Sequence, residues 1–463
     1  CVHDCNSGSL ERRTSGPCRV AGRSSVTLMV TGMPSTTIRL TTFVAAATLL
    51  FATPASAQQQ RSFDLPWAPT IDRFHQQRAE QPLWLADGQA IDLLLSILDR
   101  AALDGLPDGP RLAASARAAL QAASAGGRAE AAEAERLLSA AWVLYVQALG
   151  RPVDGVIFSD PALKPSVRPA STILREAAAA PALAEHVRRV SEVNPVYAAL
   201  REAAWRDLAF LGQPSRRVRA NLDRARILPA DGRAVVVDLA TQQLFMVEDG
   251  IVVDQMRVIV GRPEMATPLM AGTVTAMTFN PFWNVPVDLA QRNIAPQVLR
   301  NGTGWLAERG YEVLASWNDP AEVIDPASVD WQAVADRKME VRVRQRPGHH
   351  NQMGGLKIAF PNDLGIFLHD TPDRDLFSQP LRAFSSGCVR LEDARRLGRW
   401  LLKGREPEPL NGKPESPLAL PEGVPVFLTY LTAQPTPDGS IAAVYDIYGL
   451  DGERGERVAG IAN

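Results

Sequence analysis

The chain has 463 residues, of which 46% are hydrophobic and 22% are charged, and its formal net charge is -2. This length allows two or three domains with cores of their own, and the composition argues against a disordered, collagen-like or polytopic membrane protein. The near balance of acidic and basic residues also argues against a dedicated nucleic-acid-binding protein, which usually carries a basic excess.

The N-terminal region has the features of a segment that precedes the folded protein. Residues 1–32 show no helical or strand periodicity, and we expect them to be an upstream translation artefact. Residues 33–57 have the layout of a secretory signal peptide: basic Arg39, an apolar run over 43–52, and Ala55-Ser56-Ala57 at the cleavage position. The apolar run is shorter than the roughly 20 residues of a membrane span, so an uncleaved anchor is the less favoured alternative.

Three of the four cysteines, Cys1, Cys5 and Cys18, lie in this N-terminal region. An exported protein that begins after residue 57 keeps only Cys388, which has no partner for a disulfide within the chain. Its thiol is therefore either an inert core group or a reactive one.

Residues 58–228 are predicted to form a helical domain. Apolar residues recur at helical spacing over 90–98 and 132–146, and alanine, the residue with the highest helix propensity, is abundant. Glycine and proline clusters, such as the one at 105–110, separate the helices. This half of the sequence contains no phosphate loop or catalytic pairing, so we expect a packed helical scaffold.

From about residue 229 the pattern becomes that of β strands. We expect a mostly β domain over 229–408, interrupted by a helix-and-loop insertion over 288–350, and C-terminal strands and a tail over 409–463. The predicted strands are 234–239, 244–247, 251–253, 256–260, 272–279, 357–360, 365–369, 424–430 and 441–448, and a helix is predicted over 392–403. The fold class is therefore α+β, with a helical half followed by a mostly β half.

The residues best suited to chemistry are His369, which ends a predicted strand, and Cys388, which follows a small-residue loop and precedes a predicted helix. Nucleophilic catalysis by cysteine requires a thiolate, a base and hydrogen-bond donors for an oxyanion. Cys388 and His369 supply the first two. The backbone N–H groups around Ser386 and Gly387 are candidates for the third, because glycine permits unusual dihedral angles.

Arg382 and Arg390 flank Cys388 in the sequence. Their positive charge is expected to lower the pKa of the thiol and to hold a substrate carboxylate. The alternative is that Cys388 is a small buried hydrophobic residue and His369 a structural histidine.

These residues resemble the catalytic signature of the YkuD-type L,D-transpeptidases: a histidine, about fifteen residues, and then Ser/Thr-His-Gly-Cys. His369 and Ser385 fit that spacing. Further stretches resemble the large YcbB-like branch of the family: 221–224, 258–261, 267–268, 279–286 and 345–348. The resemblance covers roughly residues 215–404, and the helical half resembles the scaffold domain of that branch more weakly.

Two features depart from the family pattern. Ser386 stands where the family commonly has a histidine, although the histidine to which the family assigns the base role is present as His369. Large members of the branch also usually carry a small helical peptidoglycan-binding domain, for which residues 197–222 leave no room.

The resemblance implies a transpeptidase of the periplasm, in a Gram-negative envelope, that forms 3→3 crosslinks between peptidoglycan stem peptides through a cysteinyl thioester. It implies these roles: Cys388 as nucleophile, His369 as general acid and base, the backbone carbonyl of Asp370 as orienter of His369, backbone N–H groups of Ser386 and Gly387 as oxyanion donors, and Arg382, Arg390 and Ser385 as substrate ligands. Two alternatives remain open. One is a cysteine-dependent L,D-carboxypeptidase or endopeptidase, and the other is a non-catalytic cell-wall scaffold protein.

The implied partners are a tetrapeptide donor stem and a diamino-acid acceptor amine, with carbapenem-type β-lactams as covalent inhibitors. The resemblance implies no cofactor, no metal, no nucleic acid and no membrane span in the mature chain. We expect His349-His350 to lie in a surface loop rather than to bind a metal. We expect the insertion 288–350 to form a cap, with Trp305 as a candidate wall of the site and Trp283 in the core.

Overall fold

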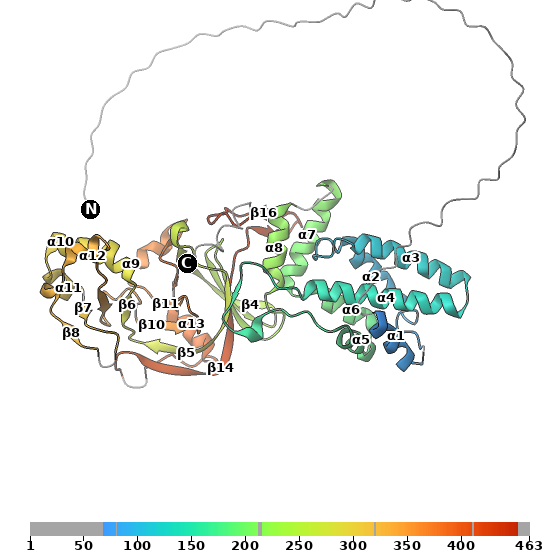
Figure 1. Ribbon diagram of the computed structural model, residues 1–463, viewed down its shortest axis with the longest axis horizontal. Coiled ribbons are helices and arrows are strands. Elements are labelled where there is room, and N and C mark those ends of the chain that lie inside the picture. The colour runs from blue at the N-terminus through green and yellow to red at the C-terminus, as the bar shows by residue number, and fades with distance from the viewer. Residues whose placement is uncertain (1–67, 80, 212–214, 319–320, 410–411, 452–463) are drawn as a thin grey trace, which may run out of the picture. The chain divides into compact units, whose positions relative to one another are not determined.

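The computed structural model describes residues 68–79, 81–211, 215–318, 321–409 and 412–451, with no description of the side chains of residues 207–211 (Figure 1). The predicted upstream artefact at 1–32 and the predicted signal peptide at 33–57 lie outside the described residues. Among the described residues, no helix combines the length and the apolar character that crossing a membrane requires.

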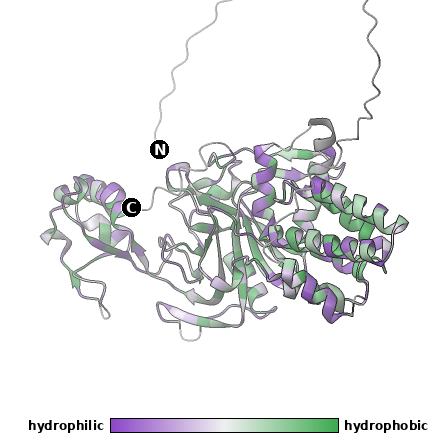
Figure 2. Ribbon diagram, turned by 45° about the vertical axis from the view of Figure 1, so that its right-hand side comes forward, coloured by the Kyte–Doolittle hydropathy of each residue, from purple (hydrophilic) through white to green (hydrophobic). Residues whose placement is uncertain are grey.

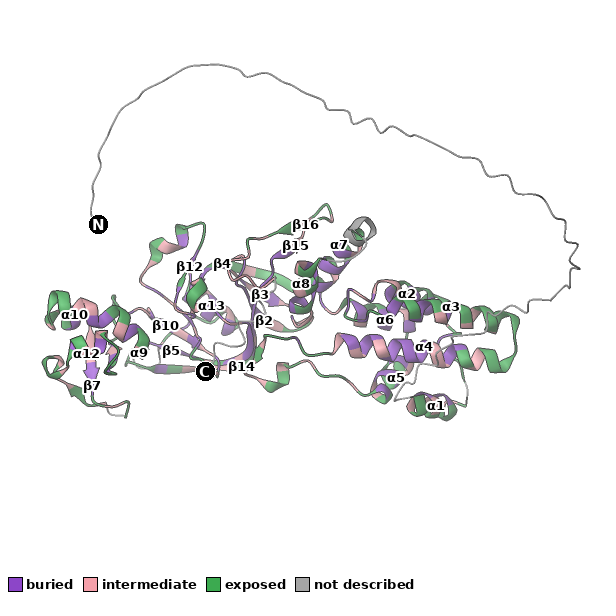
Figure 3. Ribbon diagram, turned by 45° about the horizontal axis from the view of Figure 1, so that its top comes forward, coloured by how far each residue is buried: buried purple, intermediate pink, exposed green. Residues whose placement is uncertain are grey.

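The first half of the described chain is helical, as predicted. Its helices are α1 (Ala68–Gln77), α2 (Gly88–Arg100), α3 (Gly109–Ala125), α4 (Arg128–Leu149), α5 (Ala170–Ala179), α6 (Leu183–Glu192), α7 (Pro195–Leu211) and α8 (Arg216–Arg226). Asp87 caps α2, since its side chain accepts a hydrogen bond from the N–H of Ala90 at 3.0 Å. Apolar and polar residues alternate along these helices, and α4 carries a long buried stripe (Figures 2 and 3). Burial of such stripes, rather than propensity alone, stabilises helices in a folded domain.

A buried polar cluster joins the helices of this half. The Asp104 carboxylate accepts hydrogen bonds from the hydroxyls of Tyr145 (3.0 Å) and Tyr197, and the guanidinium of Arg201 lies 3.7 Å from it. Arg201 also donates to the Tyr145 hydroxyl at 3.1 Å. Because each polar group has a partner, the cluster fixes how the loop after α2 meets α4 and α7.

The second half is built on one large sheet, and one strand of this sheet, at Ile157–Phe158 between α4 and α5, comes from the half predicted to be helical. Its strands are β1 (Ile157–Phe158), β2 (Arg233–Asp238), β3 (Gln243–Glu248), β4 (Ile251–Gly261), β5 (Met270–Phe279), β10 (Leu356–Ala359), β11 (Leu368–His369), β12 (Ala383–Ser385), β13 (Val389–Leu391) and β14 (Ser416–Thr429). The order is β1-β5-β10-β11-β13-β4-β3-β2-β14, with β12 beside β4, and β14 pairs again with β5. The sheet therefore closes on itself through the pairing of β14 with β5.

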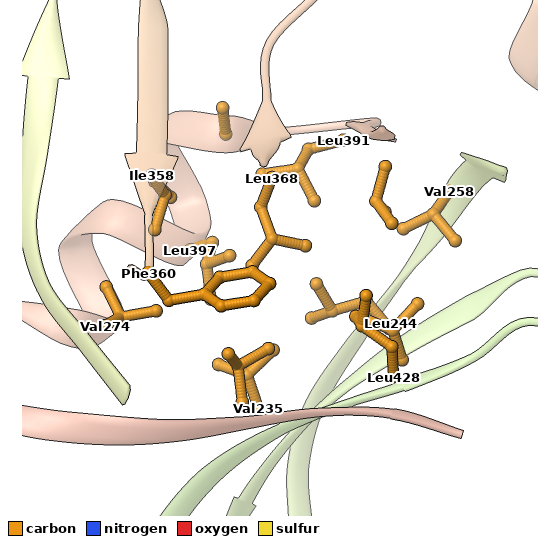
Figure 4. Packing of buried hydrophobic residues seen from close by; sticks show 14 of the residues in the cluster. Val235, Leu244, Val258, Val274, Ile358, Phe360, Leu368, Leu391, Leu397 and Leu428 are labelled. Carbon is orange, nitrogen blue, oxygen red and sulfur yellow. The ribbon is translucent and has the colours of Figure 1, made fainter. Parts of the chain in front are cut away.

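One face of this sheet forms the main core, together with α13 (Ala394–Leu401). Buried side chains from distant strands, such as Val235 and Leu368, meet Leu397 of this helix (Figure 4). Asp393 begins the helix by accepting from the N–H of Arg396 at 2.9 Å. The predicted helix over 392–403 is thus present, two residues shorter at each end.

Several strand predictions differ from the structure: the strand expected over 365–369 is limited to β11, and the one expected over 424–430 begins earlier, at Ser416 of β14. The strands expected over 251–253 and 256–260 form the single strand β4, whose pairing with β3 shifts register between Met246 and Val247. The strand expected over 441–448 is limited to β16 (Ile441–Ala443), which pairs with β15 (Ala433–Pro435). After it, the Asp446 carboxylate accepts from the N–H groups of Leu450 and Asp451, so a side-chain-stabilised turn replaces the strand.

The insertion contains a sheet as well as the predicted helices and loops. Its elements are β6 (Trp283–Val285), α9 (Val287–Leu289), α10 (Ala295–Asn301), α11 (Gly304–Glu308), β7 (Tyr311–Leu314), β8 (Val323–Ile324), α12 (Trp331–Ala335) and β9 (Arg342–Gln345), with the strand order β6-β9-β7-β8. These strands have two to four residues, too few for their period to be read from the sequence. Trp283 is only half-buried, against the insertion's own apolar cluster, and is not a fully buried core residue as predicted.

Candidate active site

Strands β11 and β13 place His369 and Cys388 on the same face of the sheet. The two strands pair in parallel, with Leu368 opposite Val389 and His369 opposite Arg390. Leu368 and Val389 belong to the core, and side chains alternate between the two faces of a strand. His369 and Cys388 therefore project from the opposite face, on strands about 4.8 Å apart.

The chain after Cys388 contains a strand that was not predicted, ahead of the predicted helix. Cys388 is followed directly by β13, and the next helix, α13, begins only at Ala394. A helix N-terminus therefore does not stabilise a thiolate at Cys388, and the electrostatics of the site come from side chains and loops.

The His369 ring is buried and fixed by the backbone. Its Nδ1 lies 2.6 Å from the carbonyl oxygen of Asp370, the contact that the family resemblance implies. A carbonyl only accepts hydrogen bonds, so Nδ1 carries the proton and Nε2 is the unprotonated nitrogen of the neutral ring. Burial and the charge of Arg390 lower the pKa of His369 to about 3, although backbone hydrogen bonds to Asp370 and Met353 act in the opposite direction.

Cys388 is half-buried, and its Sγ lies 3.5 Å from the carbonyl oxygen of Gly365. Burial raises the pKa of the thiol above its usual range, against the opposing effects of a backbone hydrogen bond from Phe367 and the charges of Arg390 and Lys357. The lowered thiol pKa expected from flanking arginines is therefore not found. The resting pair consists of a protonated thiol and a neutral imidazole.

Ser385 braces the loop that carries Cys388. Its hydroxyl donates to the Cys388 carbonyl at 2.5 Å and accepts from the N–H of Gly387 at 3.2 Å, and the residue is 2% exposed. Gly387 has a φ of +113°, in the region that favours glycine. Within the described part of the chain, the N–H groups of Ser386 and Cys388 have no protein partner, which leaves them as the candidate oxyanion donors of this loop.

The two arginines predicted to bind substrate lie in different environments. The Arg382 guanidinium is buried and donates to the backbone carbonyls of Val258 (3.1 Å), Gln379 (3.1 Å) and Gln242 (3.0 Å). These contacts join strand β4 to the turn between β2 and β3 and to the loop before β12, so the Arg382 guanidinium is occupied by backbone acceptors and not by the predicted substrate. Arg390 lies opposite His369, with its Nη1 2.8 Å from the Asp373 carboxylate.

Lys357 is a third cation of the site that sequence reasoning did not identify. It lies opposite His369 in the antiparallel pairing of β10 with β11, and its Nζ lies 5.0 Å from the centre of the Phe367 ring. Its charge acts on both His369 and Cys388. Only the pairing register brings Lys357 beside His369, and register between strands this short cannot be read from the sequence.

A pocket lies beside this face, between the insertion and the loop after β11. It is lined by Trp305, Arg309, Tyr311, Gln345, His349, His350, Gln352, Pro372 and Asp373. Trp305 stacks on Tyr311 with ring centres 5.6 Å apart and lines this pocket, whose lining includes neither Cys388 nor His369. His349 and His350 are exposed residues at its rim, and the described residues contain no group of three or more histidine, cysteine or acidic residues able to hold a metal.

Two protein families match the chain. The L,D-transpeptidase catalytic domain (YkuD) matches residues 232–411, and the Scaffold domain matches residues 69–203. A Haemophilus influenzae protein named "Putative L,D-transpeptidase" is 35% identical over 237 residues, which cover 50% of this chain and 47% of that protein. The chain thus spans about half the length of this curated relative.

Two solved structures are more distant. The L,D-transpeptidase from Mycobacterium smegmatis is 13% identical over 42% of this chain and 58% of its own, with a TM-score of 0.22. L,D-transpeptidase 3 from Mycobacterium tuberculosis, in complex with a faropenem-derived adduct, is 15% identical over 43% and 60%, also with a TM-score of 0.22. TM-scores this low carry no inference. The two family matches lie in the helical half and in the sheet in turn, so the chain carries a YkuD-type L,D-transpeptidase catalytic domain with a Scaffold domain ahead of it.

Proposed function

We propose that the protein is a periplasmic peptidoglycan L,D-transpeptidase that forms 3→3 crosslinks between stem peptides through a thioester on Cys388. The proposal rests on the placement of Cys388 and His369 on one face of adjoining strands, beside Lys357 and Arg390. This face offers a nucleophile, a neutral base and a cationic border for a substrate that carries carboxylates. The periplasmic location follows from the signal peptide expected over 33–57.

In the first step, Sγ of Cys388 attacks the carbonyl carbon of the third residue of a donor tetrapeptide, and Nε2 of His369 takes the thiol proton. The N–H groups of Ser386 and Cys388 stabilise the oxyanion. The bond between that carbonyl carbon and the nitrogen of the terminal D-alanine then breaks, and His369 gives the proton to the leaving amine. A thioester and free D-alanine result.

In the second step, the side-chain amine of an acceptor stem attacks the thioester carbonyl. His369 removes a proton from this amine and returns it to the departing sulfur, and an amide bond forms between the two stems. The thioester keeps the acyl group activated, so the transfer needs no ATP.

Lys357 and Arg390 are the proposed ligands for stem carboxylates. Arg390 is held by Asp373, so its position is fixed before substrate binds. A carbapenem-type β-lactam presents a strained amide carbonyl to the same thiol. Opening of the ring leaves no separate leaving group, so we propose that these compounds acylate Cys388 and stay attached.

The test is incubation of the purified protein with tetrapeptide-bearing muropeptides, followed by mass spectrometry of the products. Crosslinked dimers and released D-alanine are expected from the wild type and from Tyr445→Phe, a change at an exposed residue, and neither product is expected from Cys388→Ala. Shortened monomers alone would indicate a hydrolase, because water would then resolve the thioester. No conversion by the wild type would favour a non-catalytic role.

A further inference from the structure

The C-terminal segment 444–451 contacts Gly261 and Thr267, which lie next to the loop that carries Cys388. The segment lies outside the residues that the catalytic-domain family matches. The Tyr448 hydroxyl donates to the carbonyl of Gly261 at 2.7 Å and accepts from the N–H of Thr267 at 3.4 Å. Burial raises the pKa of Tyr448 to about 12. The hydroxyl is therefore protonated at neutral pH and serves as the donor to Gly261.

Thr267 links Gly261 to the loop that carries Cys388. Its Oγ1 donates to the carbonyl of Gly387 at 2.8 Å and accepts from the N–H of Gly261 at 2.9 Å, and the residue is 2% exposed. The close approach depends on glycine at 261, because a Cβ there would lie 2.2 Å from the carbonyl oxygen of Met265. Hydrogen bonds therefore run from Tyr448 through Gly261 and Thr267 to Gly387.

The Gly387 carbonyl controls the direction of a catalytic donor. This carbonyl and the N–H of Cys388 belong to one planar peptide unit, in which they point in opposite directions. The hydrogen bond from Thr267 to the carbonyl therefore also fixes the direction of the Cys388 N–H. The anchor matters because glycine has several accessible backbone conformations, and the φ of +113° at Gly387 is only one of them.

Tyr448 is itself held rigidly. Its ring stacks on Tyr430 with centres 5.4 Å apart, and its N–H donates to the Tyr430 hydroxyl at 3.0 Å. The same hydroxyl donates to Asp446 at 2.6 Å, and Arg224 of α8 lies 2.9 Å from Asp451. Contacts at both ends of the segment thus fix the position of the Tyr448 hydroxyl.

We propose that Thr267 and Tyr448 are positioning residues that hold the Gly387–Cys388 peptide so that the Cys388 N–H faces the oxyanion formed on acylation. This inference rests on the proposed function, since the oxyanion arises in acyl transfer. Neither residue touches the reacting atoms. Both act on the peptide that carries the donor.

The first test compares Thr267→Val with Thr267→Ser. Valine keeps the shape of threonine and removes the hydroxyl, whereas serine keeps the hydroxyl. With a carbapenem as the probe, we expect Thr267→Val to lower the maximal acylation rate by about 10- to 100-fold. Displacing an oxyanion donor costs part of the rate that removing the donor would cost. The carbapenem concentration at half-maximal rate stays within about twofold of the wild type, and serine restores the rate to within about threefold.

The second test compares Tyr448→Phe with Tyr445→Phe, which removes a hydroxyl from a residue that is 77% exposed in the same segment. We expect Tyr448→Phe to lower the maximal acylation rate several-fold, less than Thr267→Val, because it acts one hydrogen bond further from Gly387. Tyr445→Phe keeps the wild-type rate.

Amide hydrogen exchange provides a readout that does not depend on activity. Exchange in the peptide that contains Gly387 and Cys388 should be faster in Thr267→Val and Tyr448→Phe than in the wild type, and unchanged in Tyr445→Phe. If the wild type itself is not acylated, the proposed function fails, and exchange alone then decides the positioning role. The inference would be overturned if Thr267→Val were acylated and exchanged its amide hydrogens at the wild-type rates. It would also be overturned if Thr267→Ser were acylated as slowly as Thr267→Val.

Discussion

His369 and Cys388 are both held in their neutral forms chiefly by burial, and the neighbouring cations Arg390 and Lys357 act with burial on His369 and against it on Cys388. In a thiolate–imidazolium pair, by contrast, protonation of the thiolate would cause activity to fall below the pKa of the ion pair. In the proposed reaction, the imidazole removes the thiol proton only during attack. It can do so at any pH at which it is itself unprotonated.

We therefore predict that the rate of carbapenem acylation is constant within about twofold between pH 5 and pH 8. The pKa of His369 is about 3 and that of the Cys388 thiol is above its usual range, so neither group changes its charge in this interval. Stopped-flow or mass-resolved acylation rates across the interval test this. A tenfold loss centred between pH 6 and pH 7 would contradict it.

The lowered pKa of His369 also predicts how the stability of the protein depends on pH. In the unfolded chain His369 takes up a proton near pH 6.5, whereas in the folded protein it does so only near pH 3. Between these values the unfolded state binds more protons, so the free energy of unfolding falls as the pH is lowered. This one group contributes about 1.4 kcal/mol per pH unit.

Urea unfolding at pH 7.5 and pH 5.5 tests this contribution, with His369→Gln as the reference because glutamine does not titrate. The wild type is expected to lose more stability than the variant over this interval, by about 1.4 kcal/mol for the single unit that lies below pH 6.5. Equal losses in both proteins would show that the pKa of His369 is the same in the folded and in the unfolded protein.

Arg382 and Arg390 both flank Cys388 in the sequence, but they have different partners in the structure: Arg382 binds backbone carbonyls and Arg390 binds Asp373. Arg382→Met removes donors from buried carbonyls, each worth about 1–3 kcal/mol, and should lower the melting temperature while the folded protein keeps its KM for muropeptides. Arg390→Met removes a cation beside His369 and should raise KM about tenfold. A large KM effect from Arg382→Met at unchanged stability would restore the role predicted from the sequence.

At the scale of elements, helical spacing and alanine content identified α2 and α4, and β-branched runs identified β2, β3 and β5. These patterns repeat over at least six residues, long enough for a period to be visible. The insertion's sheet was missed because its strands are shorter than this and are stabilised by pairing with one another.

The buried cluster around Asp104 yields a prediction at this scale. Asp104→Asn leaves Arg201 buried without its anionic partner, and we expect it to lower the free energy of unfolding by about 3 kcal/mol. Asp99→Asn is the matched control: Asp99 pairs with Arg117 at 2.6 Å on the surface, where a pair is worth less than about 1 kcal/mol. Equal effects of the two substitutions would contradict the role given to the cluster.

At the scale of the whole molecule, the boundary expected after residue 408 does not separate an appendage from the catalytic sheet. β14 lies beyond that boundary and pairs in parallel with β2 and antiparallel with β5, closing the sheet. Its sequence indicates a strand over 424–430 but not its partners, because pairing between segments almost 200 residues apart leaves no local pattern. The signature around His369 and Cys388 was readable for the opposite reason, since its residues lie within one short stretch.

Truncation after Glu408 tests the role of β14. Its removal leaves β2 and β5 with unpaired edges and exposes their part of the core, so we expect aggregation or rapid proteolysis and no cooperative melting transition. A truncated chain that melts cooperatively and is acylated at the wild-type rate would show that the sheet does not require β14.

In the proposed reaction, Cys388 carries the acyl group of a stem peptide. Intact-mass measurement of the protein, quenched in acid soon after mixing with a tetrapeptide stem and no acceptor, tests this most directly. The expected result is an adduct equal to the stem minus D-alanine, located on the peptide that contains Cys388, absent from Cys388→Ala and formed much more slowly by His369→Gln. Release of D-alanine by the wild type with no adduct at any quench time, or an adduct that persists in Cys388→Ala, would contradict it.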